Sequence, residues 1–220
     1  MVRYAALFAF LSLAPGFPAA AQAVFVEIQG TVEVQAAGSE DWTAAVRGGG
    51  IAPGAVISTG FKSSAIVSLG SSRIQIRPVT RLTLEELIQK AGGDEVKLFV
   101  RAGRIRADVR SPEGRTIEFT VRSPIATASV RGTSFEFDTV NIRVDSGLVR
   151  YASAQGQTVY VAQGESAYVD DAERRMVSPQ ETAASGGLSP VSPNTGVNIA
   201  LPAPPPAASP AEVRIRPVWQ

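Results

Sequence analysis

The stretch TIEFTVRSPIATASVRGTSFEFD, residues 116–138, decides the fold. Apolar residues occupy every second position at both of its ends: Ile117, Phe119, Val121, Phe135 and Phe137. This alternation is typical of β-strands that have one buried face and one solvated face. Gly132 lies between the two ends, at a place suited to a turn. The stretch therefore predicts strands separated by tight turns.

The same period-two pattern continues from about residue 24 to residue 177, and glycines interrupt it at short intervals. Many short strands with frequent turn signals predict an all-β fold, either a short β-solenoid or β-roll or a sandwich. Three dipeptides look like hairpin or bulge positions: Glu113-Gly114, Ser146-Gly147 and Gln163-Gly164.

Residues 83–88 fit two structures. Thr83 and Glu86 have the spacing of a helix capping box, and Leu84, Leu87 and Ile88 have helical spacing. Leu84 also continues the strand alternation that precedes it. We favour a long hairpin that turns at Gly92-Gly93 over a short helix.

The two ends of the chain differ from its body. Residues 1–23, MVRYAALFAFLSLAPGFPAAAQA, have the basic, apolar and small-residue parts of a secretory signal peptide, with cleavage near Ala21–Ala23. The apolar run is too short for a transmembrane anchor, which is the main alternative. Residues 178–212 are rich in Pro, Ala and Ser and predict a linker or disordered tail, and residues 213–220 return to alternation as a possible short terminal strand. The sequence thus predicts a periplasmic or secreted β domain over residues 24–177.

Composition excludes several classes of chemistry. The chain has no Cys and no His, so it has no disulfide, no zinc site built on those residues and no imidazole or thiolate catalysis. Its 21 basic and 20 acidic residues leave a formal net charge of +1. A chain so near neutrality has no global field to gather nucleic acid. We expect no cofactor, no metal and no enzymatic activity.

Spaced motifs give the chain a family resemblance. The runs GAVISTG (54–60) and SSA (63–65) resemble the FecR pattern G-D-x-I-x-T-G-x-x-S-x-A, and residues 69–80 resemble L-x-D-G-S-x-x-x-L-x-P-x-T. The run SPIATASVRGTSF (123–135) is similar to T-P-x-A-x-A-x-V-R-G-T-x-F, and VDSGLV (144–149) to V-x-x-G-x-V. Ala55 and Ser71 depart from the pattern at turns, where the family usually has Asp or Asp-Gly. The residues that carry the motifs, which we interpret as mostly structural, are Gly54, Thr59, Gly60, Ser64, Gly70, Ser71, Pro78, Thr80, Pro124, Arg131, Gly132, Thr133, Phe135 and Gly147.

The resemblance implies a non-catalytic module of the cell envelope that binds an unknown protein or polymer, in signalling or envelope organisation. Family members that regulate transcription carry a membrane helix and a cytoplasmic sigma-factor-binding segment before this domain. The sequence predicts neither here, so we expect no direct sigma-factor binding and no transmembrane helix in the mature chain. A structural or adhesive surface component is the alternative, and a carbohydrate-active β-solenoid enzyme is a remote one.

Arginines are the candidate partner-binding residues. A basic cluster on alternating positions holds Arg104, Arg106 and Arg110 as possible contacts, with Arg101 and Arg115 beside them. A solvated sheet face is the favoured interpretation, in which these arginines pair with Asp108, Glu113 and Glu118. For Arg131 we expect a structural ion pair with Glu136 or Asp138.

Overall fold

The computed structural model describes residues 23–90, 92–111, 113–170, 172 and 175–184. Residues 1–22 of the predicted signal peptide, most of the predicted linker and the predicted terminal strand lie outside these residues, whereas Ala23 is the first residue of a strand. The described part folds into two nine-stranded sheets, named A and B below, and one short helix.

Sheet A contains β1 (Ala23–Gln29), β4 (Gly50–Ile51), β6 (Ser64–Leu69), β7 (Ser72–Ile76), β10 (Arg104–Asp108), β13 (Ser134–Asp138), β14 (Asn141–Ser146), β17 (Ser166–Asp170) and β18 (Arg175–Val177). Sheet B contains β2 (Val32–Gln35), β3 (Trp42–Ala44), β5 (Val56–Thr59), β8 (Arg81–Lys90), β9 (Gly93–Ala102), β11 (Thr116–Arg122), β12 (Ala126–Val130), β15 (Leu148–Ser153) and β16 (Thr158–Ala162). The helix is α1 (Pro179–Ala184).

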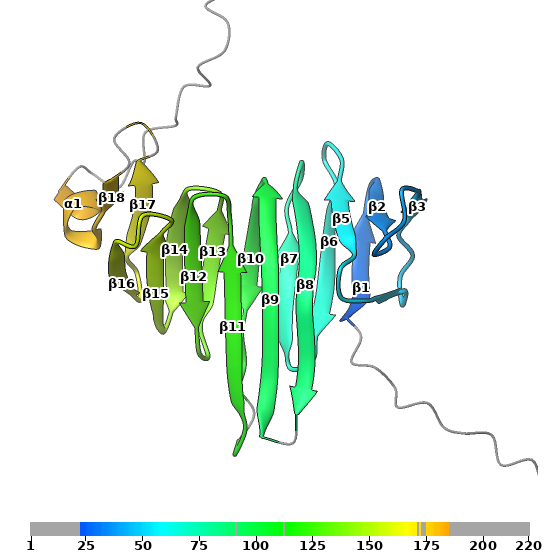
Figure 1. Cartoon of the computed structure of the whole chain (residues 1–220), viewed down its shortest axis with the longest axis horizontal. Helices are drawn as coiled ribbons and strands as arrows, with labels where there is room; N and C mark the ends of the chain where they lie inside the picture. The colour runs from blue at the N-terminus through cyan, green and yellow to red at the C-terminus, as the bar shows by residue number, and fades with distance from the viewer. Residues whose placement is uncertain (1–22, 91, 112, 171, 173–174, 185–220) are drawn as a thin grey trace, which may run out of the picture. The chain divides into compact units, whose positions relative to one another are not determined.

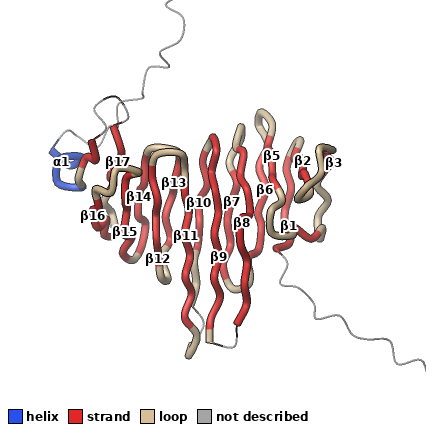
Figure 2. Tube along the Cα trace, in the orientation of Figure 1, coloured by secondary structure: helices blue, strands red, loops and turns tan. Residues whose placement is uncertain are grey.

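The strands follow one another along each sheet in nearly the order of the sequence. Sheet A runs β18-β17-β14-β13-β10-β7-β6-β1-β4, and sheet B runs β16-β15-β12-β11-β9-β8-β5-β2-β3. From β6 onward the chain lays down one or two strands in one sheet and then passes to the other, so both sheets grow in the same direction (Figure 1). The turns gather at the two ends of the strands (Figure 2). The all-β prediction is confirmed, as a sandwich with the stepwise advance of a solenoid.

From β6 onward, the connection between β9 and β11 differs from the others because it contains a single strand of the opposite sheet. Between β9 and β11 the chain makes a single crossing of sheet A as β10, and it therefore returns to sheet B in its original direction. Among the strand pairs of the described residues, β9 and β11 alone are parallel, with Val96 opposite Phe119. Every other described pair is antiparallel, as expected for hairpins and neighbouring returns.

The inner faces of the two sheets form the core. Burial alternates residue by residue along the strands, as in β11, where Ile117, Phe119 and Val121 are buried. Phe119 of sheet B meets Phe135 of sheet A edge to face, with ring centroids 6.4 Å apart. The aromatic residues of the stretch 116–138 thus join the two layers, because a period-two pattern places them all on the inner face.

The structure confirms the predicted hairpin at Gly92-Gly93 and contradicts the hairpins predicted at three other glycines. Residues 81–102 form the long β8–β9 hairpin, so the strand interpretation of residues 83–88 is confirmed. The hairpin interpretation of Gly114, Gly147 and Gly164 is wrong, because each lies where the chain passes from one sheet to the other. These glycines have positive φ, which lets the backbone turn sharply both in a hairpin and in a passage between sheets. A glycine in the sequence therefore does not distinguish the two. Helix α1 lies within the segment predicted as linker, and its Pro179 and Thr182 are buried.

Candidate functional site

Several family-motif residues build a hydrogen-bonded corner between the sheets. Thr59 and Thr80 are buried where the passages β5–β6 and β7–β8 lie side by side. The Thr59 hydroxyl donates to the Arg77 carbonyl at 2.7 Å and accepts the Thr80 N–H at 2.9 Å. The Thr80 hydroxyl donates to the Arg104 carbonyl at 3.1 Å and accepts the Arg104 N–H at 3.0 Å. These threonines satisfy backbone groups that the sheets leave unpaired.

The same device recurs at a second passage. The buried Thr133 hydroxyl donates to the Leu148 carbonyl at 3.3 Å, beside Gly147, whose φ is +89°. Gly132 has a φ of +66° and no atom within 4 Å of the position of a Cβ, so its backbone angle and not a close approach favours glycine. These contacts support the structural interpretation of the motif.

The remaining motif residues serve turns or the core. Phe135 is buried, and the Ser71 hydroxyl donates to the Arg110 carbonyl at 2.7 Å. Pro78 and Pro124 are exposed in turns, and Gly54 and Gly70 have positive φ. None of these residues lines the hollow described below.

The predicted partner of Arg131 is wrong. Its guanidinium lies 3.5 Å from Glu118 on β11, and both side chains are exposed. Arg131 follows β12 and lies on the outer face of sheet B, whereas Glu136 and Asp138 belong to β13 in sheet A. The sequence places these residues close together, but the passage at Gly132 separates them onto different sheets.

The predicted basic cluster also divides between the sheets. Arg104 and Arg106 lie on β10 in sheet A with Arg110 just beyond it, whereas Arg101 is the penultimate residue of β9 in sheet B and Arg115 precedes β11. The three candidate partner-binding arginines all have carboxylate neighbours: Arg104 with Asp138 at 3.2 Å, Arg106 with Asp145 at 2.7 Å and Arg110 with Asp108 at 2.8 Å.

These arginines therefore form ion pairs with carboxylates on the sheet surface, as expected, but most of the carboxylates are not the ones predicted. Of those named, Asp108 pairs with Arg110, and Glu118 pairs with Arg131 instead of a member of the cluster. Arg115 pairs with Asp94, whose side chain is almost buried. The Arg110 hydrogen bond is the main reason that the pKa of Asp108 is lowered, and the Ser134 hydroxyl acts in the same direction.

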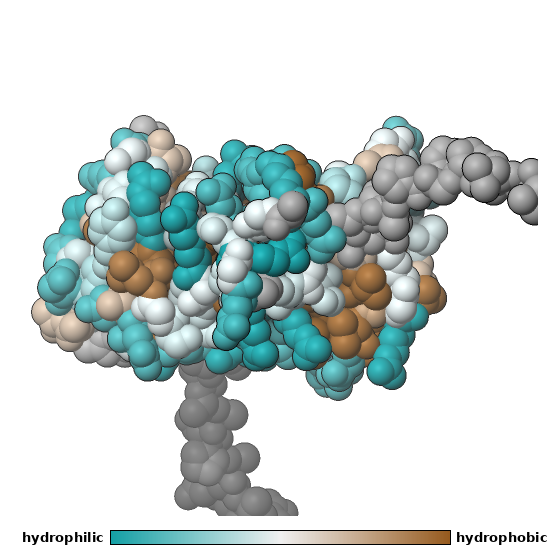
Figure 3. All heavy atoms as spheres, turned by 90° about the horizontal axis from the view of Figure 1, so that it is seen from below, coloured by the Kyte–Doolittle hydropathy of each residue, from teal (hydrophilic) through white to brown (hydrophobic). Residues whose placement is uncertain are grey.

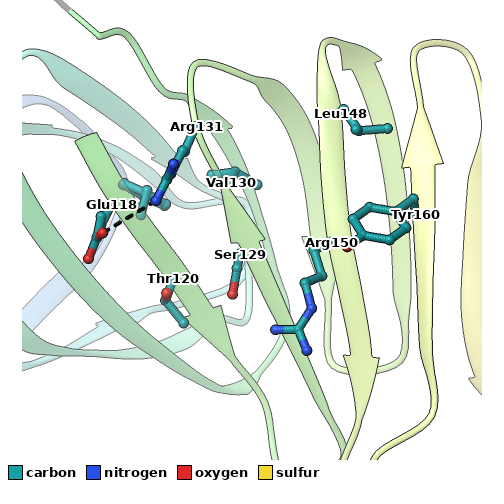
Figure 4. A pocket seen from close by; sticks show the side chains of 9 residues that line it. Glu118, Thr120, Ser129, Val130, Arg131, Leu148, Arg150 and Tyr160 are labelled. Carbon is teal, nitrogen blue, oxygen red and sulfur yellow. Dashed lines mark hydrogen bonds and ion pairs between the residues drawn. The ribbon is translucent and has the colours of Figure 1, made fainter. Parts of the chain in front are cut away.

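A shallow hollow on the outer face of sheet B is a candidate binding site (Figure 4). It lies over β11, β12, β15 and β16, and it is lined by Glu118, Phe119, Thr120, Ser129, Val130, Arg131, Leu148, Arg150 and Tyr160. Strand register explains how it forms. Thr120 lies opposite Ser129, Ser129 opposite Arg150, and Arg150 opposite Tyr160, so one row of outward side chains crosses four strands.

The hollow combines cations, hydroxyls and apolar surface. Tyr160 and Leu148 are 63% and 54% exposed, so both neighbouring strands present apolar surface to solvent. Figure 4 shows Arg150 extending over the sheet between Ser129 and Tyr160. Among the described residues Arg150 has no carboxylate within ion-pair distance, whereas Lys97 on the same face lies beside Glu86 and Glu95. Such a surface suits a ligand that carries both a carboxylate and an apolar group.

Sequence reasoning missed this hollow, although a signal exists. Tyr160 lies between Val159 and Val161, and Leu148 precedes Val149, so an apolar residue occupies a position that the alternation reserves for a polar one. Leu148 and Tyr160 are these two apolar residues at positions expected to be polar. They form a patch only because β15 and β16 pair in the register that places Leu148 opposite Ala162.

Other features of the described surface are less informative. The end that carries the β8–β9 turn is mainly hydrophilic, with two hydrophobic patches that are separate from each other (Figure 3). Within the described ranges there is no group of three or more Asp or Glu residues placed to hold a metal ion. In the same ranges, no helix is long and apolar enough to cross a membrane.

Comparisons with known proteins give one family. A family model described as FecR protein matches residues 55–165. Two crystal structures of a proposed anti-sigma factor from Parabacteroides distasonis ATCC 8503, at 2.50 and 1.65 Å resolution, are 18% identical to the chain, each with a TM-score of 0.46. The similarity covers 59% of this chain and 62% and 63% of those chains, so this chain spans less than two thirds of their length. No curated protein matches the sequence.

Proposed function

The chain belongs to the FecR protein family, and from that premise we propose that it is a non-catalytic module that binds a protein or polymer partner outside the cytoplasm. Export rests on the signal-peptide pattern of residues 1–23. The absence of a direct contact with a sigma factor stays a prediction from the sequence.

The hollow on sheet B is the observation that carries the proposal. Arg150 offers a guanidinium that has no carboxylate partner among the described residues, and Tyr160 and Leu148 offer apolar surface within the same few strands. Arginine and tyrosine are among the residues enriched at the energetic centre of protein interfaces. The arginines of sheet A fit this role less well, because carboxylates of the same sheet already neutralise Arg104 and Arg106.

Binding fits the hollow better than catalysis does. Its only carboxylate, Glu118, is largely exposed and lies beside Arg131, and its hydroxyls on Thr120 and Ser129 have no neighbouring base among the lining residues. A nucleophile needs a base within hydrogen-bond reach to be activated. The side chains that line the hollow therefore support recognition of a partner and not its chemical conversion.

Photo-crosslinking in intact cells tests this function. A photoreactive phenylalanine analogue replaces Tyr160 in the hollow, and in a matched control it replaces Tyr168 on β17 of sheet A. We expect one dominant crosslinked partner from position 160 and none from position 168. A ladder of self-crosslinked products would favour the structural or adhesive alternative. Crosslinks from position 168 alone would contradict the assignment of the hollow.

A further inference from the structure

One edge of sheet B is formed by β16, which is longer than the other edge strands. The four edge strands are β3 and β16 in sheet B and β4 and β18 in sheet A. β3, β4 and β18 have only two or three residues, whereas β16 has five. Very short edge strands are one of the ways in which proteins prevent unwanted strand pairing. β16 lacks this protection.

The hairpin register shows which backbone groups of β16 face outward from the sheet. Ser153 N–H donates to the Gln157 carbonyl at 2.8 Å, which makes these two residues a hydrogen-bonded pair. Hydrogen-bonded and non-hydrogen-bonded pairs alternate along an antiparallel ladder. Arg150 and Tyr160, three positions further along, are therefore a non-hydrogen-bonded pair, as are Ala152 and Thr158. The N–H and C=O groups of Thr158 and Tyr160 point away from β15.

The far end of this edge is already occupied. Ala162 N–H donates to the Glu165 carboxylate at 2.8 Å, and the Ala162 carbonyl accepts the Glu165 N–H at 3.0 Å. The turn after β16 thus closes one end of the edge. Thr158 and Tyr160 are exposed, and helix α1, at the same end of the sandwich, packs against β17 of sheet A. Among the residues that the structure describes, no strand pairs with the outward side of the segment from Thr158 to Tyr160, and we call this segment the open edge.

The charge beside this edge indicates what could pair with it. Arg150 lies directly opposite Tyr160 on the outer face and has no carboxylate partner among the described residues. Arg122 and Lys97 on the same face do have partners, at Glu85 and Glu86 respectively. An acidic side chain on the outer face of an added strand would supply the missing charge.

We propose that β16 accepts an extended segment of a partner protein as an additional strand of sheet B, and that this segment carries an acidic side chain directed at Arg150. The inference rests on the proposed function, and it specifies the mode of binding and the chemical class of the partner. Backbone hydrogen bonds to Thr158 and Tyr160 provide affinity in this mode, and side chains at alternate positions provide specificity.

The distances allow this arrangement. Neighbouring strands lie about 4.8 Å apart, so an added strand lies about 10 Å from β15. Figure 4 shows the Arg150 guanidinium on the Ser129 side of β15, so the arginine changes rotamer to meet a glutamate across the ring of Tyr160, and the two extended side chains together span this distance. The tyrosine ring and Leu148 then lie on the same face as the side chains two positions before and after the acid.

A peptide probe tests the proposal on the full exported chain. The probe is a blocked peptide, Thr-Val-Glu-Val-Glu-Val-Thr, and two matched peptides have Lys in place of Glu or N-methylated backbone nitrogens at alternate positions. We expect the parent probe to bind and to slow hydrogen exchange at the amides of Thr158 and Tyr160. Both matched peptides should bind about tenfold more weakly or worse, because they lose the ion pair or the backbone hydrogen bonds.

Protein variants give the corresponding control. Arg150→Glu should weaken the parent probe about tenfold, while Arg143→Glu, an exposed arginine on the outer face of sheet A, should leave its affinity unchanged. Equal binding of the N-methylated probe, unchanged exchange at Thr158 and Tyr160, or no binding up to about 1 mM overturns strand addition. If position 160 still crosslinks one partner in cells, only this inference fails and the proposed function stands.

Discussion

Gly103 and Thr80 lie so close together that a Cβ atom on Gly103 would be 2.5 Å from the Thr80 Cα. Gly103 begins the passage from β9 to β10, and Thr80 ends the passage from β7 to β8. Two consecutive crossings between the sheets are thus packed backbone against backbone, and the Thr80 hydroxyl bonds both backbone groups of Arg104. This contact fixes how far apart successive passages lie.

We expect Gly103→Ala to destabilise the fold by about 2 kcal/mol or more, because the new methyl group overlaps backbone that cannot move away and φ is +89°. Gly114→Ala is the matched control, since Gly114 has a φ of +72° but no atom near its Cβ position. Its cost should be about 1 kcal/mol from the backbone angle alone. Urea unfolding of both variants checks this, and equal losses would contradict the role of the close contact.

Gly132→Val should impair folding through its backbone angle. A β-branched residue is strongly disfavoured at a φ of +66°, although the space around the position is open. Gly132→Asn should cost less, since asparagine tolerates left-handed angles. Thermal unfolding ranks the two variants. A Val variant that keeps native stability but loses its crosslinked partner would show that the motif serves binding and not folding.

Tyr151→Phe should lower stability by about 1 kcal/mol, the typical net value of one hydrogen bond. The buried Tyr151 hydroxyl donates to the Val140 carbonyl at 2.7 Å, and burial raises the pKa of the phenol. The same carbonyl also accepts the Val169 N–H at 2.9 Å, so it keeps one partner in the variant. Tyr160→Phe, with an exposed ring, is the control and should be neutral in chemical denaturation.

Acid should remove the stabilisation that comes from the Asp108 ion pair. The hydrogen bond from Arg110 holds the pKa of Asp108 below its unfolded value, so this carboxylate stabilises the fold above about pH 4. The contribution is lost as the pH falls through the lowered folded pKa. Asp108→Asn should therefore be less stable than the wild type at pH 7, and the difference should shrink toward pH 2. Asp41→Asn, which removes a carboxylate with no ion pair among the described residues, should show no such trend in urea titrations at the two pH values.

The core could be predicted from the sequence because alternation is a local property. Ile117, Phe119 and Phe135 were expected on a buried face from spacing alone, and each of them is buried. The β8–β9 hairpin could be predicted for the same reason, since Leu84 and Leu98 continue the period-two pattern on both sides of the turn.

The candidate site could not be predicted in this way. Glu136 is closer to Arg131 in sequence than Glu118 is, yet Arg131 pairs with Glu118, because Gly132 sends the chain to the other sheet. A glycine with a positive φ has the same sequence signal in a hairpin and in a passage between sheets. Which of the two it makes depends on the partner strands, which are distant in the sequence.

The sequence by itself thus determined that the chain is all-β, which residues face the core and which family it belongs to. These features depend on periodicity and short motifs, which involve residues close together in the chain. Only the tertiary structure decided which outward side chains become neighbours. The register of β12, β15 and β16 brings Ser129, Arg150 and Tyr160 into one row. That row, and the open edge beside it, arise from strand pairing across the sheet, which side-chain alternation within one strand does not specify.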